Sequence, residues 1–66
     1  MLVVINGEKT ELPAPRTIAQ LLAEQGFAGR AVAVEVNKKI VPRKLHADTT
    51  LRDGDQVEMV TLVGGG

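Results

Sequence analysis

One stretch of this sequence, residues 18–25, has the periodicity of an amphipathic helix, and segments rich in β-branched residues lie on both sides of it. Ile18, Leu21 and Leu22 occupy positions i, i+3 and i+4, so they share one apolar stripe. A helix of this kind between strands crosses over and packs on one face of the sheet. The pattern therefore favours an α+β fold with one helix against one sheet.

Capping residues mark both ends of this helix. Thr17 is a suitable N-cap, and Gln20, three residues later, completes a capping box. Gly26 suits the left-handed position that follows the last turn, and Phe27 after it is typical of a Schellman ending. We expect the helix to run from about residue 18 to residue 25.

The segment before the helix predicts a β-hairpin. Residues 2–5 (LVVI) are apolar and mostly β-branched, which is typical of a strand in the middle of a sheet. Asn6-Gly7 follows at once and favours a tight hairpin turn, because both residues tolerate positive φ. Residues 8–12 are expected to return antiparallel, and Pro13 ends that strand because it cannot donate a ladder hydrogen bond.

The segment after the helix predicts two further strands. Residues 31–37 alternate strictly between two faces, which indicates a strand with one covered face. Residues 37–39 are typical of a turn, and residues 40–41 predict a short strand that Pro42 stops.

The remainder of the chain predicts a loop, a turn and the longest strand. Residues 43–50 have neither period, and we expect a surface loop there with one tight turn. Residues 52–55 (RDGD) predict a turn before the last strand, residues 56–63. The first and last strands are the most apolar, so we expect them side by side and parallel in the middle of the sheet.

Together these elements predict a β-grasp, or ubiquitin-like, fold. A mixed sheet of four or five strands packs on one helix in this α+β architecture. We expect residues 1–63 to form the β-grasp domain and residues 64–66 to form a flexible C-terminal glycine tail.

Composition argues against several classes of function. Eight basic residues balance eight acidic ones, so the chain lacks the basic surface that a nucleic-acid or anionic-membrane partner attracts. Phe27 is the single aromatic residue and cysteine is absent, which removes base stacking, disulfides and thiolate metal sites. No apolar run approaches the roughly 20 residues that span a bilayer, and the N-terminus lacks a signal-peptide pattern. We expect a cytoplasmic protein without nucleic-acid or membrane partners.

No pattern of residues indicates a catalytic or metal site. His46 is the only histidine, and we interpret it as a surface or loop-packing residue. Asp53 and Asp55 flank a glycine, and such a motif is more often a turn with self-capping side chains than half of a metal site. The basic run at residues 42–46 fits a solvated loop or a docking edge for an acidic surface. We expect a protein that is not an enzyme, binds no cofactor or metal, and is acted on by other proteins.

The sequence ends in three glycines, Gly64, Gly65 and Gly66. Three extended residues reach about 10 Å, and without side chains they fit a channel too narrow for other residues. Such a thread would deliver the terminal carboxylate into the active site of another protein. A carboxylate needs activation before a nucleophile attacks it, and we expect an acyl-adenylate made by a partner because the chain has no phosphate-binding loop. The alternatives are a frayed terminus or a leftover linker.

Four motifs together resemble the sulfur carrier proteins of thiamine biosynthesis, the ThiS family of ubiquitin-related β-grasp proteins. They are NGE after the first strand, IVPR at residues 40–43, LRDGDQVE at residues 51–58, and the closing VGGG. The resemblance covers essentially the whole chain. Members of the family typically end in Gly-Gly, so Gly64 is an additional glycine.

The resemblance implies a co-substrate in a sulfur-transfer cycle. A ubiquitin-activating-like adenylyltransferase, which itself binds ATP and magnesium, would adenylate the carboxylate of Gly66. Sulfur from a donor such as a cysteine desulfurase persulfide would convert it to a thiocarboxylate. Thiazole synthase would then take the sulfur for the thiazole ring of thiamine, while Gly64 and Gly65 thread through the channel of the partner.

The last strand also suggests a docking surface. Gln56 and Glu58 place one face of this strand in solvent, and Val60 and Leu62 continue the same face. We expect Val60 and Leu62 to form part of an exposed patch that contacts the activating enzyme beside the tail. The alternative is that the helix or a curled end of the sheet covers them.

Three other functions fit the same sequence. A carrier for molybdopterin synthesis or for tRNA thiolation would share the fold, the tail and the activation step. A ubiquitin-like modifier would leave isopeptide-linked products on lysines of its targets. A β-grasp binding module without a carrier role would tolerate the loss of Gly65 and Gly66.

Overall fold

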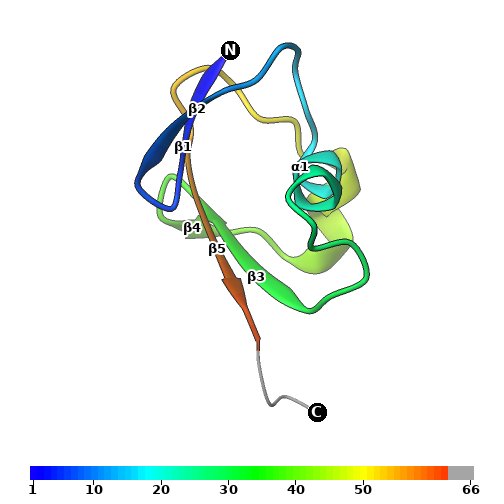
Figure 1. Ribbon diagram of the computed structural model, residues 1–66. Coiled ribbons are helices and arrows are strands. Elements are labelled where there is room, and N and C mark those ends of the chain that lie inside the picture. Colours follow the sequence, from blue (N-terminus) through cyan, green and yellow to red (C-terminus); the bar gives the residue numbers. More distant parts are fainter. Residues whose placement is uncertain (63–66) are drawn as a thin grey trace.

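The computed structural model describes residues 1–62, so the expected end of the last strand and the expected glycine tail lie outside the described residues. Within these residues, one α-helix packs against one face of a single sheet (Figure 1). The elements in chain order are β1 (Leu2–Ile5), β2 (Glu8–Glu11), α1 (Ile18–Glu24), β3 (Val32–Val36), β4 (Lys39–Ile40), the 3₁₀ helix η1 (Arg43–Asp48) and β5 (Gln56–Thr61). The order of strands in the sheet is β2-β1-β5-β3-β4.

The two central strands, β1 and β5, are parallel neighbours. Val4 lies opposite Gln56, and Ile5 lies opposite Val57. The N–H of Asn6 also donates to the carbonyl of Val57 at 2.8 Å. The other strand pairings formed by residues 1–62 are antiparallel, so this part of the chain forms a mixed sheet of five strands. The predicted β-grasp fold, with the most apolar strands in the centre, is therefore confirmed.

The predicted capping box starts α1. The N–H of Gln20 donates to Thr17 Oγ1 at 3.1 Å, and the N–H of Thr17 donates to Gln20 Oε1 at 2.8 Å. Two main-chain donors that the first turn leaves free are thereby satisfied. The helix ends at Glu24 with Gln25 as its C-cap, one residue earlier than the sequence predicts.

The predicted Schellman ending closes the same helix. Gly26 has a φ of 87°, in the left-handed region that favours glycine. Its N–H donates to the carbonyl of Ala23 at 3.2 Å, and the N–H of Phe27 donates to the carbonyl of Leu22 at 2.8 Å. This pair of bonds turns the chain sharply back toward the sheet.

Both hairpins turn on residues with positive φ. Asn6 and Gly7 have φ values of 50° and 83°, which fits the predicted tight turn between β1 and β2. The second turn uses Asn37 and Lys38, at 52° and 69°, whereas Lys39 belongs to β4 and was expected in the turn. A two-residue loop lets Lys39 pair with the end of β3, and this shortens the predicted turn by one residue.

The loop expected at residues 43–50 is wrong in part, because residues 43–48 form η1. Pro42 precedes its first turn, and its carbonyl accepts from the N–H of Leu45 at 2.9 Å. The hydroxyl of Thr49 donates to the carbonyl of Leu45 at 2.7 Å and closes the other end. A short 3₁₀ helix depends on such local bonds and carries no apolar stripe of period 3.6, so periodicity gives no signal for it.

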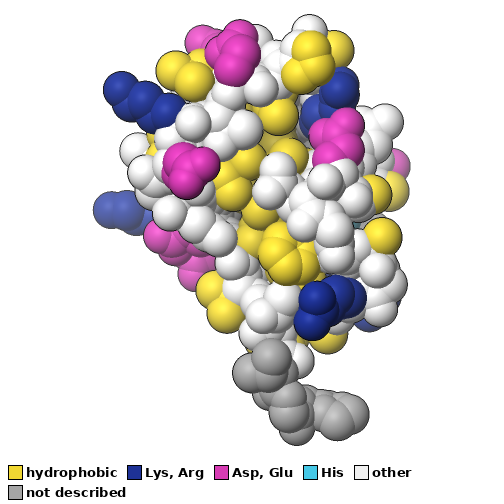
Figure 2. All heavy atoms as spheres, in the orientation of Figure 1, with side chains coloured by type: hydrophobic (Ala, Val, Ile, Leu, Met, Phe, Trp, Pro, Cys, Tyr) yellow, Lys and Arg dark blue, Asp and Glu magenta, His cyan; other side chains and the backbone are white. Residues whose placement is uncertain are grey.

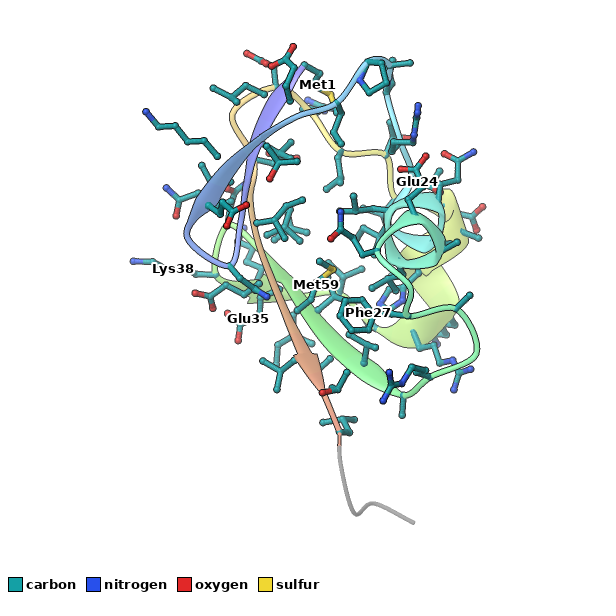
Figure 3. The ribbon with its side chains drawn as sticks, viewed as in Figure 1. Met1, Glu24, Phe27, Glu35, Lys38 and Met59 are labelled. Carbon is teal, nitrogen blue, oxygen red and sulfur yellow. The ribbon has the colours of Figure 1, made fainter. Side chains whose placement is uncertain are left out.

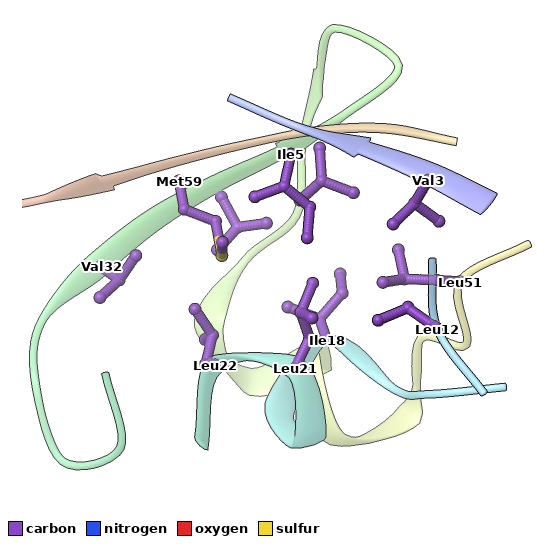
Figure 4. Close-up of a cluster of buried hydrophobic side chains, with 11 residues drawn as sticks. Val3, Ile5, Leu12, Ile18, Leu21, Leu22, Val32, Leu51 and Met59 are labelled. Atoms are coloured by element: carbon purple, nitrogen blue, oxygen red, sulfur yellow. The ribbon is translucent and has the colours of Figure 1, made fainter. Parts of the chain in front are cut away.

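The core lies between α1 and the sheet. Figure 4 shows the α1 side chains pointing toward side chains of β1, β3 and β5, with Leu12 and Leu51 at one end. Its members are Val3, Ile5, Leu12, Ile18, Leu21, Leu22, Val32, Val34, Leu51, Val57 and Met59. Burial of each large aliphatic side chain contributes about 1.5–3 kcal/mol, so this cluster is the main source of stability in a chain without disulfides.

Candidate functional site

The candidate site is the end of β5, where the chain leaves the sheet toward its last residues (Figure 1). Side chains of this strand alternate, and Val57 and Met59 are buried under the sheet. Val60 is 60% exposed and Leu62 is 57% exposed, so neither α1 nor a curled sheet covers them. The exposure expected of these two residues is confirmed, whereas their docking role stays a prediction.

The antiparallel neighbour β3 holds this end of β5 in place. Val60 lies opposite Ala33, and Thr61 lies opposite Val32. The N–H of Leu62 donates to the carbonyl of Ala31 at 3.0 Å, one residue beyond the strand. The last described residue is therefore anchored to the body, which fixes where the C-terminal segment starts.

On the other side of β5, the side chain of Asn6 replaces the main chain of β1 as the hydrogen-bonding partner. Its Nδ2 donates to the carbonyl of Met59 at 3.2 Å, and its Oδ1 accepts from the N–H of Met59 at 2.8 Å. The amide thus extends the ladder by one residue after the main chain of β1 has turned into the hairpin. The sequence predicts Asn6 only as a turn residue, because its partner Met59 lies 53 positions away along the chain.

The outer face of the sheet next to this site carries two opposed carboxylates. Glu35 of β3 and Glu58 of β5 lie directly opposite each other in the register. Within residues 1–62, neither of them is in an ion pair. Ile40, opposite Glu35 on β4, is 74% exposed on the same face. Like charges directly opposite each other on a sheet repel and disfavour folding. A cationic group bound at this face would reduce the repulsion between the two carboxylates.

The aspartates of the RDGD segment accept hydrogen bonds both within the turn and from other segments of the chain. Asp53 Oδ1 accepts from the N–H of Leu2 at 2.7 Å, and Asp55 Oδ2 accepts from the N–H of Arg52 at 2.8 Å. Asp55 Oδ1 also accepts from Asn37 Nδ2 at 3.0 Å. The self-capping interpretation is confirmed for Asp55 and is wrong for Asp53, which caps the start of β1 and not its own turn. No group of three potential metal ligands occurs within the described part of the chain.

His46 is buried at the base of η1. One of its ring nitrogens, Nε2, lies 3.0 Å from the carbonyl of Val41 and bonds to it. Since this contact joins η1 to the end of the preceding segment, His46 is a loop-packing residue, one of the two interpretations given by the sequence.

The three glycines assigned to the site, Gly64, Gly65 and Gly66, lie outside the described residues. The structure describes the end of β5 that precedes them. Val60 and Leu62 are exposed there, Leu62 is hydrogen-bonded to Ala31, and Met59 is hydrogen-bonded to the side chain of Asn6. Figure 3 shows the same end of the sheet with Met59 and Phe27 close by on the inner side. No helix in residues 1–62 has the length and apolar character needed to cross a membrane.

A small five-stranded β-grasp domain whose central strand leads directly into a glycine-rich end defines the class of ubiquitin-like proteins. Comparison with known proteins gives the family within that class. The model of the ThiS family matches residues 3–66, and the chain belongs to the ThiS family.

Individual relatives agree with this assignment. The chain is 38% identical over 65 residues to the sulfur carrier protein ThiS of Thermus thermophilus, covering 98% of this chain and all of that protein. It is 46% identical over 66 residues to a thiazole synthase of Paramagnetospirillum magneticum. That alignment covers all of this chain and 20% of the synthase, so the chain spans about a fifth of the length of this relative.

A solved structure has the same fold. The crystal structure of the thiamine biosynthesis protein ThiS from Geobacter metallireducens superposes with a TM-score of 0.85 and is 30% identical in sequence. The match covers 100% of both chains. The sulfur-carrier family resemblance and the β-grasp fold expected from sequence motifs are both confirmed.

Proposed function

We propose that this protein carries sulfur as a thiocarboxylate on Gly66 and donates it for formation of the thiazole ring of thiamine. It acts in the cytoplasm as a co-substrate of other enzymes and is itself no enzyme. Membership of the ThiS family over residues 3–66, a match that includes the three glycines, is the observation that carries this proposal.

The proposed reaction begins at the terminal carboxylate. An oxygen of the Gly66 carboxylate attacks the α-phosphorus of ATP, pyrophosphate leaves, and an acyl-adenylate remains. A sulfur nucleophile then adds to the acyl carbon, and AMP leaves. If sulfide is the nucleophile, the product is the thiocarboxylate. If a cysteine desulfurase supplies a persulfide, the product is an acyl disulfide, which a thiol reduces to the thiocarboxylate.

ATP and magnesium belong to the activating partner in this proposal. The partner is a ubiquitin-activating-like adenylyltransferase, and this chain binds no cofactor of its own. Gly64 and Gly65 thread into the active site of the partner, because residues without side chains fit a narrow channel. Val60 and Leu62 contact the partner beside that channel, and their exposure next to the start of the C-terminal segment supports this role.

Thiazole synthase is the proposed acceptor of the sulfur. A relative named thiazole synthase contains a region 46% identical to this entire chain, which supports a functional link between the two proteins. The resemblance to carriers of the thiamine pathway favours this acceptor over molybdopterin synthase or a tRNA thiolation enzyme.

Mass spectrometry of the intact protein tests the proposal. The protein is incubated with a purified ubiquitin-activating-like adenylyltransferase, ATP, magnesium, and either sulfide or a cysteine desulfurase with cysteine and a thiol. We expect a mass increase equal to the replacement of one oxygen by one sulfur, and fragmentation places it on Gly66. A reaction without ATP and a chain that lacks Gly66 serve as controls. No mass change in the complete reaction would argue for a β-grasp binding module.

A further inference from the structure

The last residue of β5, Thr61, has main-chain groups that face an open edge of the sheet. The N–H of Leu62 donates to the carbonyl of Ala31, so these two residues form a hydrogen-bonded pair that continues the ladder between β5 and β3. Hydrogen-bonded and non-hydrogen-bonded pairs alternate in an antiparallel ladder. Thr61, opposite Val32, is therefore in a non-hydrogen-bonded position, and its N–H and C=O point away from β3.

On that opposite side, the neighbouring strand has already ended. The pairing of β1 with β5 stops at Ile5 and Val57. The side chain of Asn6 then occupies the N–H and C=O of Met59. No described residue of β1 or β2 is in register with Thr61, so among residues 1–62 the edge of β5 is open at Thr61.

A hollow of about 240 Å³ lies under the sheet beside this edge. Ile5 and Met59, inward-facing side chains of the two bordering strands, form part of it, and Phe27, which follows α1, forms another part. Polar residues form the rest of the lining at its mouth: Asn6, Glu8 and Thr10 of the first hairpin, and Gln25. Figure 2 shows hydrophobic side chains exposed in a seam between the sheet and α1, in the region where Figure 3 places Met59 and Phe27.

These features match the requirements for adding a strand to a sheet. Main-chain groups at an open edge bind an extended segment, and a hollow beside the edge accepts one of its side chains. On the outer face, exposed Val60 and Leu62 would flank the same segment.

We propose that an extended segment of thiazole synthase adds to the sheet at Thr61 and inserts one apolar side chain into the hollow between Ile5, Met59 and Phe27. This inference rests on the proposed function, since it describes how the acceptor binds the carrier. Thiazole synthase is chosen as the occupant because a relative carries a region like this chain within a thiazole synthase polypeptide. An added strand here continues directly toward the C-terminal segment, which it helps to direct into the acceptor.

Amide hydrogen exchange tests the pairing at a single atom. In the free protein, we expect the Thr61 amide to exchange rapidly and the Val60 amide to be protected, because Val60 pairs with Ala33 of β3. Saturation with thiazole synthase from the same organism should slow exchange at Thr61 by at least about tenfold and change Val60 little. A complex in which Thr61 exchanges at its free rate would overturn the proposal. The proposal would also be overturned if a second copy of this chain bound and protected the Thr61 amide in the absence of the synthase.

Two proline variants test the same bond by affinity. Thr61→Pro removes the outward N–H without removing a bond to β3, and prolines are tolerated where a strand donor faces solvent. We expect the Kd for thiazole synthase to rise by about tenfold, as loss of roughly one main-chain hydrogen bond implies. Lys9→Pro is the matched control. Leu12 N–H bonds to the Met1 carbonyl, so alternation places the Lys9 N–H on the far edge of β2, and its loss should leave the Kd unchanged.

A third variant tests the hollow without a proline. Thr10 lies on β2 opposite inward-facing Val3, and Thr10→Phe places a ring in the mouth of the hollow. We expect this variant to fold, because Thr10 is only half-buried on an edge strand, and to bind thiazole synthase about tenfold more weakly. An unchanged Kd for both Thr61→Pro and Thr10→Phe would contradict the proposal.

The failures of the two proposals are distinguishable. If the wild-type protein acquires the thiocarboxylate and binds thiazole synthase while Thr61 stays unprotected, only the strand-addition proposal fails. If no thiocarboxylate forms and no complex with thiazole synthase is found, the proposed function fails and the strand-addition proposal fails with it.

Discussion

The side-chain amide of Asn6 hydrogen-bonds to both the N–H and the C=O of Met59, and so acts in place of a main-chain peptide of β1. This contact lies where β1 turns into its hairpin and β5 continues alone toward the C-terminus. The turn residue of the first hairpin therefore also fixes the last strand.

Replacement of Asn6 by Asp should lower the free energy of unfolding by about 1–2 kcal/mol. Asp tolerates the φ of 50° at this position, but it loses the donor to the Met59 carbonyl and sets a carboxylate beside that oxygen. Urea unfolding followed by circular dichroism measures the change. Glu8→Gln, at an exposed position in the same hairpin, is the control and should change stability little. Equal stability of Asn6→Asp and wild type would show that the hydrogen bonds between Asn6 and Met59 do not stabilise the fold.

Replacement of Lys38 by Gly should stabilise the protein by up to about 1 kcal/mol. Lys38 has a φ of 69°, a conformation that costs a residue with a Cβ but not glycine. The change also creates an Asn-Gly turn like that of the first hairpin. Thermal unfolding measures the effect. Lys39→Gly, one residue later in β4, should lower stability instead, and a stabilised Lys39→Gly would show that strain at Lys38 is not the cause.

Much of the fold follows from signals that lie close together in the sequence. Thr17 and Gln20 are three residues apart, and both bonds of their capping box form. The φ angles of Asn6-Gly7 are those that the dipeptide predicts. Local backbone chemistry determined these features, so the sequence revealed them directly.

Other features depend on register and long-range contact, which periodicity does not encode. The opposition of Glu35 and Glu58 appears only when β3 and β5 are aligned. The open edge at Thr61 depends on where β1 stops relative to β5. Residues of η1 gave no helical signal because local 3₁₀ bonds, and not an apolar stripe, form this element.

Replacement of Glu58 by Gln should raise the free energy of unfolding by about 0.2–1 kcal/mol. The change removes one member of the opposed carboxylate pair and leaves the size of the side chain almost unchanged. High salt should shrink the gain, because it screens the repulsion between exposed charges. Denaturant unfolding at low and high salt measures both effects. A gain of the same size in Glu8→Gln, on β2 at the far side of the sheet from Glu35, would assign the effect to net charge.

Replacement of Leu62 by Glu should weaken binding of the activating adenylyltransferase while the fold remains intact. Leu62 is 57% exposed, so the new charge stays in solvent in the free protein but is desolvated in the proposed interface. We expect a Kd at least about tenfold higher by titration calorimetry. Leu45→Glu, at an exposed position on η1, is the matched control. An unfolded Leu62→Glu variant, or equal weakening by Leu45→Glu, would remove Leu62 from the docking surface.

Deletion of Gly65 and Gly66 from the chromosomal gene tests most directly whether the chain's own end carries the sulfur. We expect such cells to fail to grow without thiamine and to grow normally when the thiazole precursor is supplied, while the truncated protein retains the thermal stability of the full chain. Normal growth of the truncated strain in medium without thiamine or thiazole would contradict this expectation.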